Sequence, residues 1–462
     1  MQYSEKMTSL EIRASSWLAG IFGLRMLGVF LIIPVFAIYA KTLPGGDNYL
    51  LVGLAFGMYN LTQAFFQLPF GMASDKFGRK PVIYFGLILL AVGSFVAYSA
   101  QDIYWVIAGR AIQGAGAISA AVTALMADIT REEHRTKAMA LIGMSIGLAF
   151  GISMAISPTL AKLIGVAGIF ALTGILSILA IFVVRFFIPD PKESHFHSDT
   201  ELSATKLSSV LKEPDLLRLN FGIFSLHAMH MAMFVVIPFA LIESGGLDQS
   251  QHWKVYVPVL LSSVVLMIPM IIYGEKKGKL KEIFVGSVAL LLCAQLLFSM
   301  FLSEFWLVVL SLLFFFVAFN TLEANIPSLI SRIAPATAKG TAMGVHSTTQ
   351  SLGLFVGAVA GGALVRYAGQ HSVFIFGAVL CGLWLLLASG MNTPPAVRNM
   401  MYRVKQMSET EAKALSQKLS ALQGVFEAVV VGDEGTAYIK ADKKGFDEQG
   451  VLQCLDAVQI AE

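Results

Sequence analysis

One carboxylate stands deep inside a long apolar stretch of the sequence. Glu323 is the only acid between Phe305 and Ile330, and Asn320 precedes it by three residues. An ionisable group among apolar residues is costly unless it has a partner or a function. A carboxyl group in that setting is suited to bind and release a proton, so we expect Glu323 to carry protons. The competing interpretation is a neutral acid that only ties helices together through hydrogen bonds.

Two arginines interrupt other apolar stretches. Arg110 precedes Gln113 by three residues, and Arg25 precedes Pro34. A guanidinium group in hydrocarbon must face a cavity or a partner, so we expect Arg110 to tune the proton site and Arg25 to line a solute cavity with Gln113. The alternatives are a structural Arg110 that bonds to backbone carbonyls, and an Arg25 that reaches toward the membrane surface.

Histidine and amide side chains complete the set. His227 and His230 lie one helical turn apart and titrate near neutral pH, so they are candidates for proton coupling unless they are packed in the core. Amides recur at helical spacing, where they line a cavity or bond to neighbouring helices. The predicted cavity residues of this type are Asn60, Gln63, Gln67, Asn320 and Gln350.

The composition identifies the setting of these residues. Of 462 residues, 56% are hydrophobic and only 14% are charged, against about 25% charged in soluble domains. Soluble enzymes, secreted disulfide scaffolds and disordered chains are therefore excluded, and a net charge of +3 argues against nucleic-acid binding. The three cysteines have no metal-ligand spacing, and no nucleotide loop or nucleophile motif is present, so we expect no metal, no cofactor and no enzyme. The sequence predicts a multi-pass protein of the lipid bilayer.

Apolar stretches of spanning length occur twelve times, six on each side of a polar break. The first six are Trp17–Ala40, Leu50–Ala73, Pro81–Ala100, Tyr104–Ala127, Lys137–Leu163 and Gly168–Ile188. The second six are Leu217–Ile242, Trp253–Tyr273, Glu282–Met300, Phe305–Ile330, Thr341–Ala368 and His371–Met391. The predicted domains are a first half (1–190), a linker (191–216), a second half (217–392) and a small terminal domain (398–462). Two six-helix halves predict a transporter whose solute site lies between them.

Lysine and arginine gather in alternate loops, which should face the cytoplasm. The basic loops contain Lys76, Arg79, Lys80, Arg131, Arg135, Lys137, Lys276, Lys277, Lys279, Lys281, Arg332 and Lys339. The other loops offer only Lys41, Lys254 and Arg366 near their edges. We therefore expect both termini in the cytoplasm.

The loop after the second span carries the most specific motif, Gly71-Met-Ala-Ser-Asp75-Lys-Phe-Gly78-Arg79-Lys-Pro. It resembles the signature loop of the major facilitator superfamily, and the stretch Arg110-Ala-Ile-Gln-Gly resembles a motif of proton-coupled members. The resemblance implies that Asp75 engages Arg79 and the positive end of the helix near Gly340, as a latch for one of two conformations. Asp128 is a third candidate for this network or a solvated acid, and the basic residues have the alternative role of setting topology alone.

The second half and the fifth span match the family pattern less well. Gly278 stands where the second half should repeat the acid, so no second latch is expected. The fifth span keeps Pro158 of an exporter motif but not the paired glycines around it. This weakening is the best support for a uniporter or symporter.

The tail after Pro395 predicts a small soluble domain. A strand at Met400–Met407, a helix opened by a capping box at Ser408 and Glu411, a hairpin of two strands and a second helix at Asp447–Leu455 give a β-α-β-β-α order. This resembles a ferredoxin-like fold of the heavy-metal-associated type. Cys454 stands alone where a metal would need a Cys-x-x-Cys pair, so a cytoplasmic regulator is the predicted partner and a passive tail the alternative.

Together, these observations predict an all-α membrane protein with twelve transmembrane helices in two halves and a small α+β ferredoxin-like domain. The resemblance to the superfamily implies a proton-coupled antiporter of the bacterial inner membrane, which is expected to export a small amphiphilic or drug-like solute by alternating access. The alternative from another class is a membrane sensor that signals through the small domain.

Overall fold

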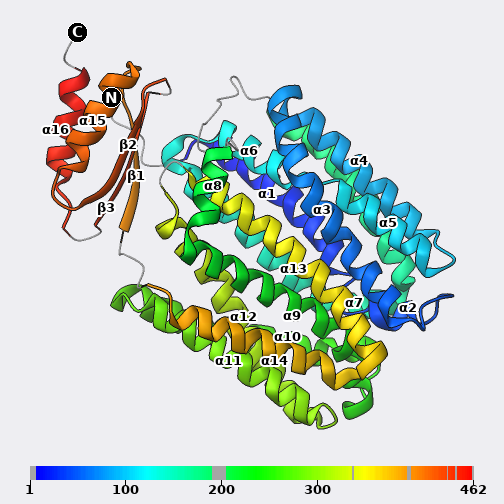
Figure 1. Cartoon of the computed structure of the whole chain (residues 1–462). Helices are drawn as coiled ribbons and strands as arrows, with labels where there is room; N and C mark the ends of the chain where they lie inside the picture. Colours follow the sequence, from blue (N-terminus) through cyan, green and yellow to red (C-terminus); the bar gives the residue numbers. More distant parts are fainter. Residues whose placement is uncertain are drawn as a thin grey trace.

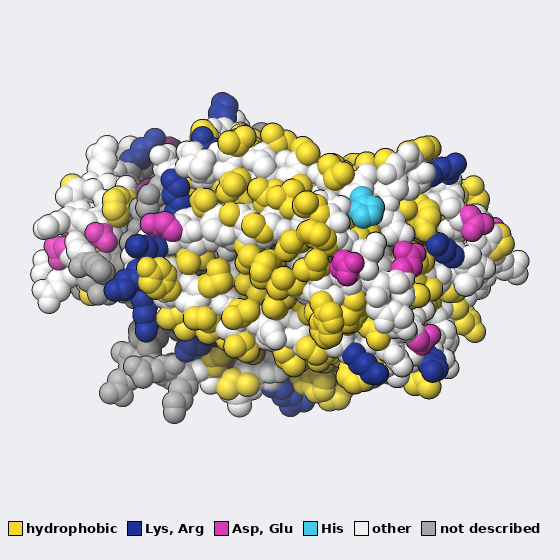
Figure 2. Space-filling view, turned by 90° about the horizontal axis from the view of Figure 1, so that it is seen from below, with side chains coloured by type: hydrophobic (Ala, Val, Ile, Leu, Met, Phe, Trp, Pro, Cys, Tyr) yellow, Lys and Arg dark blue, Asp and Glu magenta, His cyan; other side chains and the backbone are white. Residues whose placement is uncertain are grey.

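A computed structural model describes residues 7–189, 204–335, 338–392, 397–433, 435–442 and 445–459. Long helices lie side by side in one bundle, and a small domain sits beside one end of it (Figure 1). We call that end of the bundle the domain end and the opposite one the far end. On the face in Figure 2, apolar side chains form a broad band between two zones that carry charged groups, as expected of a surface in contact with lipid.

The first half contains seven helices by backbone geometry. They are α1 (Ser9–Phe30), α2 (Phe36–Ala40), α3 (Tyr49–Phe77), α4 (Arg79–Tyr98), α5 (Ile103–Ala115), α6 (Ser119–Ile129) and α7 (Glu132–Phe187). The first predicted span is split into α1 and α2, because Pro34 has no amide hydrogen for a continuous helix. The fourth is interrupted by a short turn between α5 and α6.

The fifth and sixth spans are merged in α7, which has 56 residues. At 1.5 Å per residue this helix is roughly 84 Å long, against about 30 Å of hydrocarbon in a bilayer. Gly165 has φ 72°, a left-handed conformation that glycine tolerates, and it divides α7 into two spans near the positions predicted from the sequence.

Helix α8 (Ala204–Lys212) lies in the stretch predicted as a linker, before the second half. Residues 191–203 of that linker lie outside the described residues. The spans that follow are α9 (Pro214–Gly245), α10 (Trp253–Lys277), α11 (Leu280–Phe301), α12 (Phe305–Ile333), α13 (Lys339–Ala368) and α14 (Gln370–Ser389), and a short 3-10 helix covers Gln249–Gln251.

In the described part of the chain, ten helices are long and apolar enough to cross a membrane, with α5 and α6 counted as one. The division of α7 and the α1–α2 pair bring the total to the twelve spans predicted. Helix α9 is the core of the second half, with 94% of its apolar segment buried. Its main neighbour is α13, and α12 and α14 contact it less extensively.

The small domain has the predicted order of elements, namely β1 (Val397–Arg403), α15 (Glu409–Ser420), β2 (Val425–Val431), β3 (Thr436–Asp442) and α16 (Glu448–Gln459). The sheet order is β1-β3-β2 with antiparallel neighbours, as in a split β-α-β ferredoxin-like fold. The first strand begins at Val397 rather than at the predicted Met400. The capping box at Ser408 and Glu411 is present.

The domain touches the bundle at the turn between α12 and α13. The ammonium group of Lys440 lies 3.3 Å from the carbonyl oxygen of Ala334 and 3.5 Å from that of Ile333. These carbonyls end α12, where the helix dipole attracts a cation. Burial lowers the pKa of Lys440, while the nearby Glu427 and Glu213 oppose that shift.

Candidate functional site: two polar clusters and a charged network

The first half buries a polar cluster around the phenol of Tyr59. Arg25 donates hydrogen bonds to Ser119 Oγ (2.6 Å), Tyr59 Oη (2.7 Å) and Gln63 Oε1 (3.0 Å). Its side chain is 3% exposed, although a snorkelling arginine would reach the surface. The structure therefore brings two of the predicted cavity residues, Arg25 and Gln63, together in an environment of neutral acceptors. We call this set of residues, with Arg110, the Tyr59 cluster.

Arg110 lies on the other side of the same ring. Its guanidinium carbon is 4.9 Å from the ring centroid of Tyr59, and that of Arg25 is 5.9 Å away. Arg110 donates to Gln113 Oε1 (3.1 Å), and Gln113 donates to Ser94 Oγ (2.7 Å). No described contact joins Arg110 to Glu323, so the predicted tuning of that acid has no direct geometric route in this conformation.

The other two amides of α3 behave differently from Gln63. Asn60 is buried with its Nδ2 unpartnered among the described residues. Gln67 is half-buried and makes no hydrogen bond within the described parts of the chain. Tyr59, Ser119 and Ser94 were not predicted as site residues, because single hydroxyl groups give no recognisable sequence pattern.

The second half holds a cluster built on α9, α12 and α13. Gln350 donates from Nε2 to Glu323 Oε1 (3.0 Å), and the same nitrogen lies 2.8 Å from His227 Nε2. His227 Nδ1 lies 3.2 Å from the carbonyl oxygen of Ile223. A tautomer with its hydrogen on Nδ1 satisfies both contacts, since it donates to Ile223 and accepts from Gln350. We call this set of residues the Glu323 cluster.

Glu323 keeps one oxygen without a hydrogen bond. Its Oε2 is buried and unpartnered in the described part of the structure, and His227 Nε2 lies 3.6 Å away. The side chain as a whole is 38% exposed. His346, also buried, has an unpartnered Nδ1 and interacts electrostatically with Glu323.

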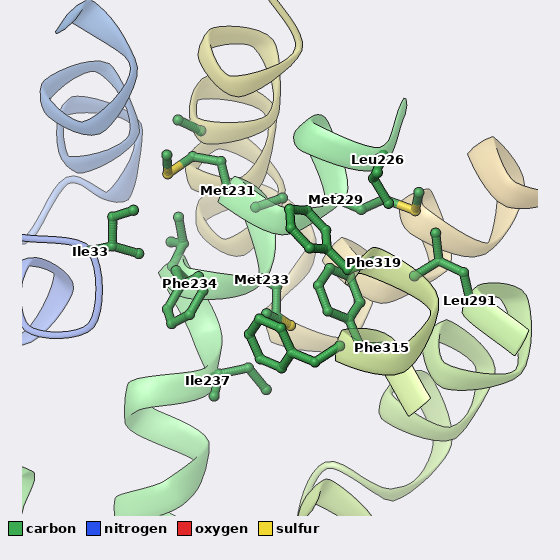
Figure 3. Packing of buried hydrophobic residues seen from close by; sticks show 14 of the residues in the cluster. Ile33, Leu226, Met229, Met231, Met233, Phe234, Ile237, Leu291, Phe315 and Phe319 are labelled. Carbon is green, nitrogen blue, oxygen red and sulfur yellow. The ribbon is translucent and has the colours of Figure 1, made fainter. Parts of the chain in front are cut away.

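The other two predicted members of this half are placed apart from the carboxylate. Asn320 donates to Ser263 Oγ on α10 (2.9 Å) and makes no described bond to Glu323. Both ring nitrogens of His230 are unpartnered, and phenylalanine rings surround it, with centroids at 4.7 Å for Phe319 and 5.3 Å for Phe234. Figure 3 shows the apolar packing of α9 against α12 at this place. His230 therefore fits the core interpretation better than the proton-coupling one.

A network of charged side chains lies at the domain end of the first half. Arg79 donates to both Asp75 and Asp128, the latter at 2.9 Å, and also to Ser74 Oγ (2.8 Å). Asp128 is almost fully buried, with its side chain 3% exposed, so it is a member of the network rather than a solvated acid. Among the described residues, no contact joins Asp75 to the start of α13 near Gly340.

The motif that holds this network is more helical than its sequence suggests. Gly71 and Asp75 belong to α3, and only Gly78, at φ 90°, forms the turn to α4. Gly71 has room for a β-carbon, with the nearest atom at 3.6 Å, so the tight reversal depends on Gly78 alone. Gly278 forms the same turn after α10 with φ 68°, so it is the counterpart of Gly78. The acid position of the second half is then held by Glu275, which accepts a hydrogen bond from Arg332 (3.1 Å), so the expectation that Gly278 replaces the acid was wrong.

The two halves meet closely between α3 and α13. A β-carbon on Gly53 would lie 2.3 Å from the carbonyl oxygen of Ala358, and one on Gly57 would lie 2.9 Å from the ring of Phe355. Further contacts join the halves at the far end, where Lys41 lies 4.1 Å from the ring centroid of Phe239. At the domain end, the described ion pairs each stay within one half.

Comparisons with known proteins agree with this architecture. The family model described as Major Facilitator Superfamily matches residues 18–353 and 257–400. The Inner membrane transport protein YajR of Escherichia coli (strain K12) is 41% identical over 439 residues, which cover 95% of this chain and 96% of that protein. The Quinolone resistance protein NorA of Staphylococcus aureus (strain COL) is 26% identical, covering 78% and 92% of the two chains.

Solved structures show the same fold at low identity. An inward-facing, occupied bacterial homologue of the human lysosomal transporter Spinster superposes with a TM-score of 0.66 at 12% identity, covering 83% of this chain and 97% of that one. The human organic anion transporter MFSD10 gives a TM-score of 0.60 at 16% identity, covering 82% and 100%. With its two six-helix halves and its signature motif, the chain belongs to the major facilitator superfamily of membrane transporters.

Proposed function

We infer that this transporter is a proton-coupled antiporter that exports a small amphiphilic solute across the bacterial inner membrane, with both termini in the cytoplasm. The observation that carries the proposal is the Glu323 cluster. One oxygen of the carboxyl group is held by Gln350, and the other has no hydrogen bond in the described structure. A carboxyl group that is fixed at one oxygen and free at the other is arranged to take up and release a proton.

The position of the cluster supports coupling to the solute path. Glu323 contacts groups on α9 and α13, and α13 packs against α3 of the first half. A change in the charge of Glu323 therefore alters the electrostatic field close to the α3–α13 contact between the two halves. We refer to this contact as the α3–α13 seam. Rocking of two halves around a central site is the motion that the fold supports.

The pattern of contacts supports alternating access. The halves are joined at the far end and along the α3–α13 seam, and the Asp75–Arg79–Asp128 network is confined to the first half. With the domain end in the cytoplasm, this conformation is closed toward the outside. In the opposite conformation, Asp75 would meet the start of α13 and latch the domain end shut, where the helix dipole favours an acid.

The test is solute flux into proteoliposomes under an imposed pH gradient, with a quinolone as the first probe because NorA is named for resistance to that class. Glu323→Gln should abolish the gradient-dependent part of the flux and leave the protein folded. Glu304→Gln is the matched control, since Glu304 is the N-cap residue of α12, the helix that carries Glu323, and is exposed. Equal flux with and without the gradient in the unaltered protein would reject proton coupling.

A sensor that signals through the small domain is distinguished by truncation. Removal of residues 393–462 should leave solute flux in place if the chain is a transporter. Loss of a ligand-dependent partner interaction, with no flux in either form, would favour the sensor instead.

A further inference from the structure

The first half buries two cations and supplies no acid to neutralise them. Arg25 and Arg110 are each 3% exposed and share the ring of Tyr59. Acids of residues 7–189 occur only at helix ends and in turns. They are Glu11, Asp47, Asp75, Asp102, Asp128, Glu132 and Glu133. Buried charges without a counter-charge are strongly unfavourable, so a carrier that retains two of them has a use for the positive field.

Arg25 is the better placed of the two to receive an anion. All three of its hydrogen bonds go to neutral groups, and its Nε is unpartnered in the described structure. Two of the acceptors, Gln63 and Ser119, are only partly buried, whereas the guanidinium group that they bind is buried. A carboxylate or phosphate that displaces Gln63 would gain a charge-assisted bond in place of a neutral one.

The Tyr59 cluster and the Glu323 cluster lie at the same level of the bundle. Helices α3 and α13 run antiparallel, with Gly53 against Ala358 and Gly57 against Phe355. Extending this register by less than two turns brings Gln63 to the level of Gln350, within about one turn. At an offset of 204 residues, Phe170 matches Phe374 and the two positive-φ glycines Gly165 and Gly369 coincide. The same offset makes Ser119, the partner of Arg25, the counterpart of Glu323.

We propose that the solute is dipolar, with an anionic group bound by Arg25 and a protonated amine bound by Glu323. This inference rests on the proposed function, because it places the solute between the two halves. The amine end competes with the proton for Glu323, as an antiporter requires. The anionic end offsets the positive field of Arg25 and Arg110 and fixes the orientation of the solute across the seam.

The test uses three fluorescent probes that share one aromatic group: 2-naphthylalanine, its amide and its N-acetyl derivative. The first has both charges, the second only the cation and the third only the anion. Binding to the purified full chain in detergent is followed by naphthyl fluorescence. We expect 2-naphthylalanine to bind at least tenfold more tightly than either derivative.

The variants separate recognition from folding. Arg25→Gln should weaken 2-naphthylalanine at least tenfold and leave the affinity of the amide unchanged, and Arg25→Lys should restore part of the loss. Binding of the amide thus shows that the variant is folded and that the cation-binding part of the site at Glu323 is intact. The inference is overturned if the amide binds as tightly as 2-naphthylalanine, if Arg25→Gln weakens all three probes equally, or if none of them binds.

This result is independent of proton coupling. Charge-selective binding of the probes without gradient-driven flux would support the anion site at Arg25 and reject the proposed antiporter function. Gradient-driven flux of a quinolone, with probe affinities that do not respond to Arg25→Gln, would keep the antiporter and reject the anion site.

Discussion

Gln350 faces Glu323 across the contact between α12 and α13, with its amide nitrogen 3.0 Å from Oε1 of the carboxyl group. The same nitrogen lies 2.8 Å from Nε2 of His227 on α9. One amide therefore connects the proton candidate to a titratable ring on the most deeply buried helix of the second half. A change in the protonation state of Glu323 or His227 therefore alters the electrostatic environment of the other through the Gln350 amide.

Replacement of Gln350 by leucine should uncouple the two groups. The carboxyl group loses its only described hydrogen-bond donor, which in mutational series costs about 1–3 kcal/mol when a buried group is left unsatisfied. We expect gradient-driven flux to fall at least tenfold and its pH dependence to change. Gln101→Leu is the control, since Gln101 is an exposed amide just before the start of α5. Equal loss in both variants would show that any amide substitution damages the protein.

The Arg79 network predicts unequal effects for its two acids. Asp128→Asn removes a buried partner of a buried arginine and should lower the free energy of unfolding by about 3 kcal/mol. Asp75→Asn alters a carboxylate that is 38% exposed and should cost no more than about 1 kcal/mol. Thermal unfolding in detergent measures both values. A larger effect from Asp75→Asn would contradict the assignment of Asp128 to the core of the network.

Asp75 should nevertheless matter more for transport than for stability. In the latch proposal it meets the start of α13 only in the conformation closed at the domain end, so Asp75→Asn should slow flux while the fold is retained. Accessibility of single cysteines at the domain end would report the shift in conformation. Unchanged flux and accessibility would remove the latch from the account.

Acid sensitivity is predicted for the start of α1. Glu11 accepts hydrogen bonds from the side chain and the backbone of Arg131, and the bond to the Arg131 side chain is the main reason that its pKa falls from 4.5 to about 2. The carboxylate therefore stabilises the folded state fully above pH 4.5, and this contribution is lost as the pH falls toward 2. Glu11→Gln should lower the melting temperature at pH 7 and flatten its dependence on pH below 4.5. Parallel curves for the two proteins would contradict the prediction.

The small domain should loosen when its contact with α12 is removed. Lys440 is 7% exposed and caps the last carbonyl groups of α12, the helix that carries Glu323. Lys440→Ala should raise hydrogen exchange at the turn between α12 and α13 and leave the domain itself folded. Lys413→Ala is the control, because Lys413 pairs with Glu409 on an exposed helix face. Equal hydrogen exchange at this turn in the two variants would show that Lys440 does not attach the small domain to α12.

Much of this architecture follows from the sequence because it depends on local patterns. Apolar stretches of spanning length predicted the helices, and the capping box at Ser408 predicted the start of α15. Hydropathy does not reveal where a single backbone conformation interrupts a span. The first predicted span, Trp17–Ala40, is divided before Pro34, and the polar stretch that holds α8 gave no prediction of a helix.

The candidate site was only partly predictable, because its geometry is tertiary. Charge inside an apolar stretch revealed Arg25, Arg110 and Glu323 without showing which of them share a cluster. Tyr59 links the two arginines, yet a tyrosine among apolar residues gives no distinct sequence signal. Asn320 precedes Glu323 by three residues in the sequence, yet it donates to Ser263 on the neighbouring helix, a contact that sequence spacing does not reveal.

The central claim is that solute and protons move in opposite directions through this protein. It is tested most directly with the full chain in proteoliposomes that contain a pH-sensitive dye and receive a quinolone gradient with no initial pH difference. The account predicts proton flux opposite to the solute, absent in Glu323→Gln and retained in Glu304→Gln. Solute flux with no proton movement, or with protons moving alongside the solute, would contradict it.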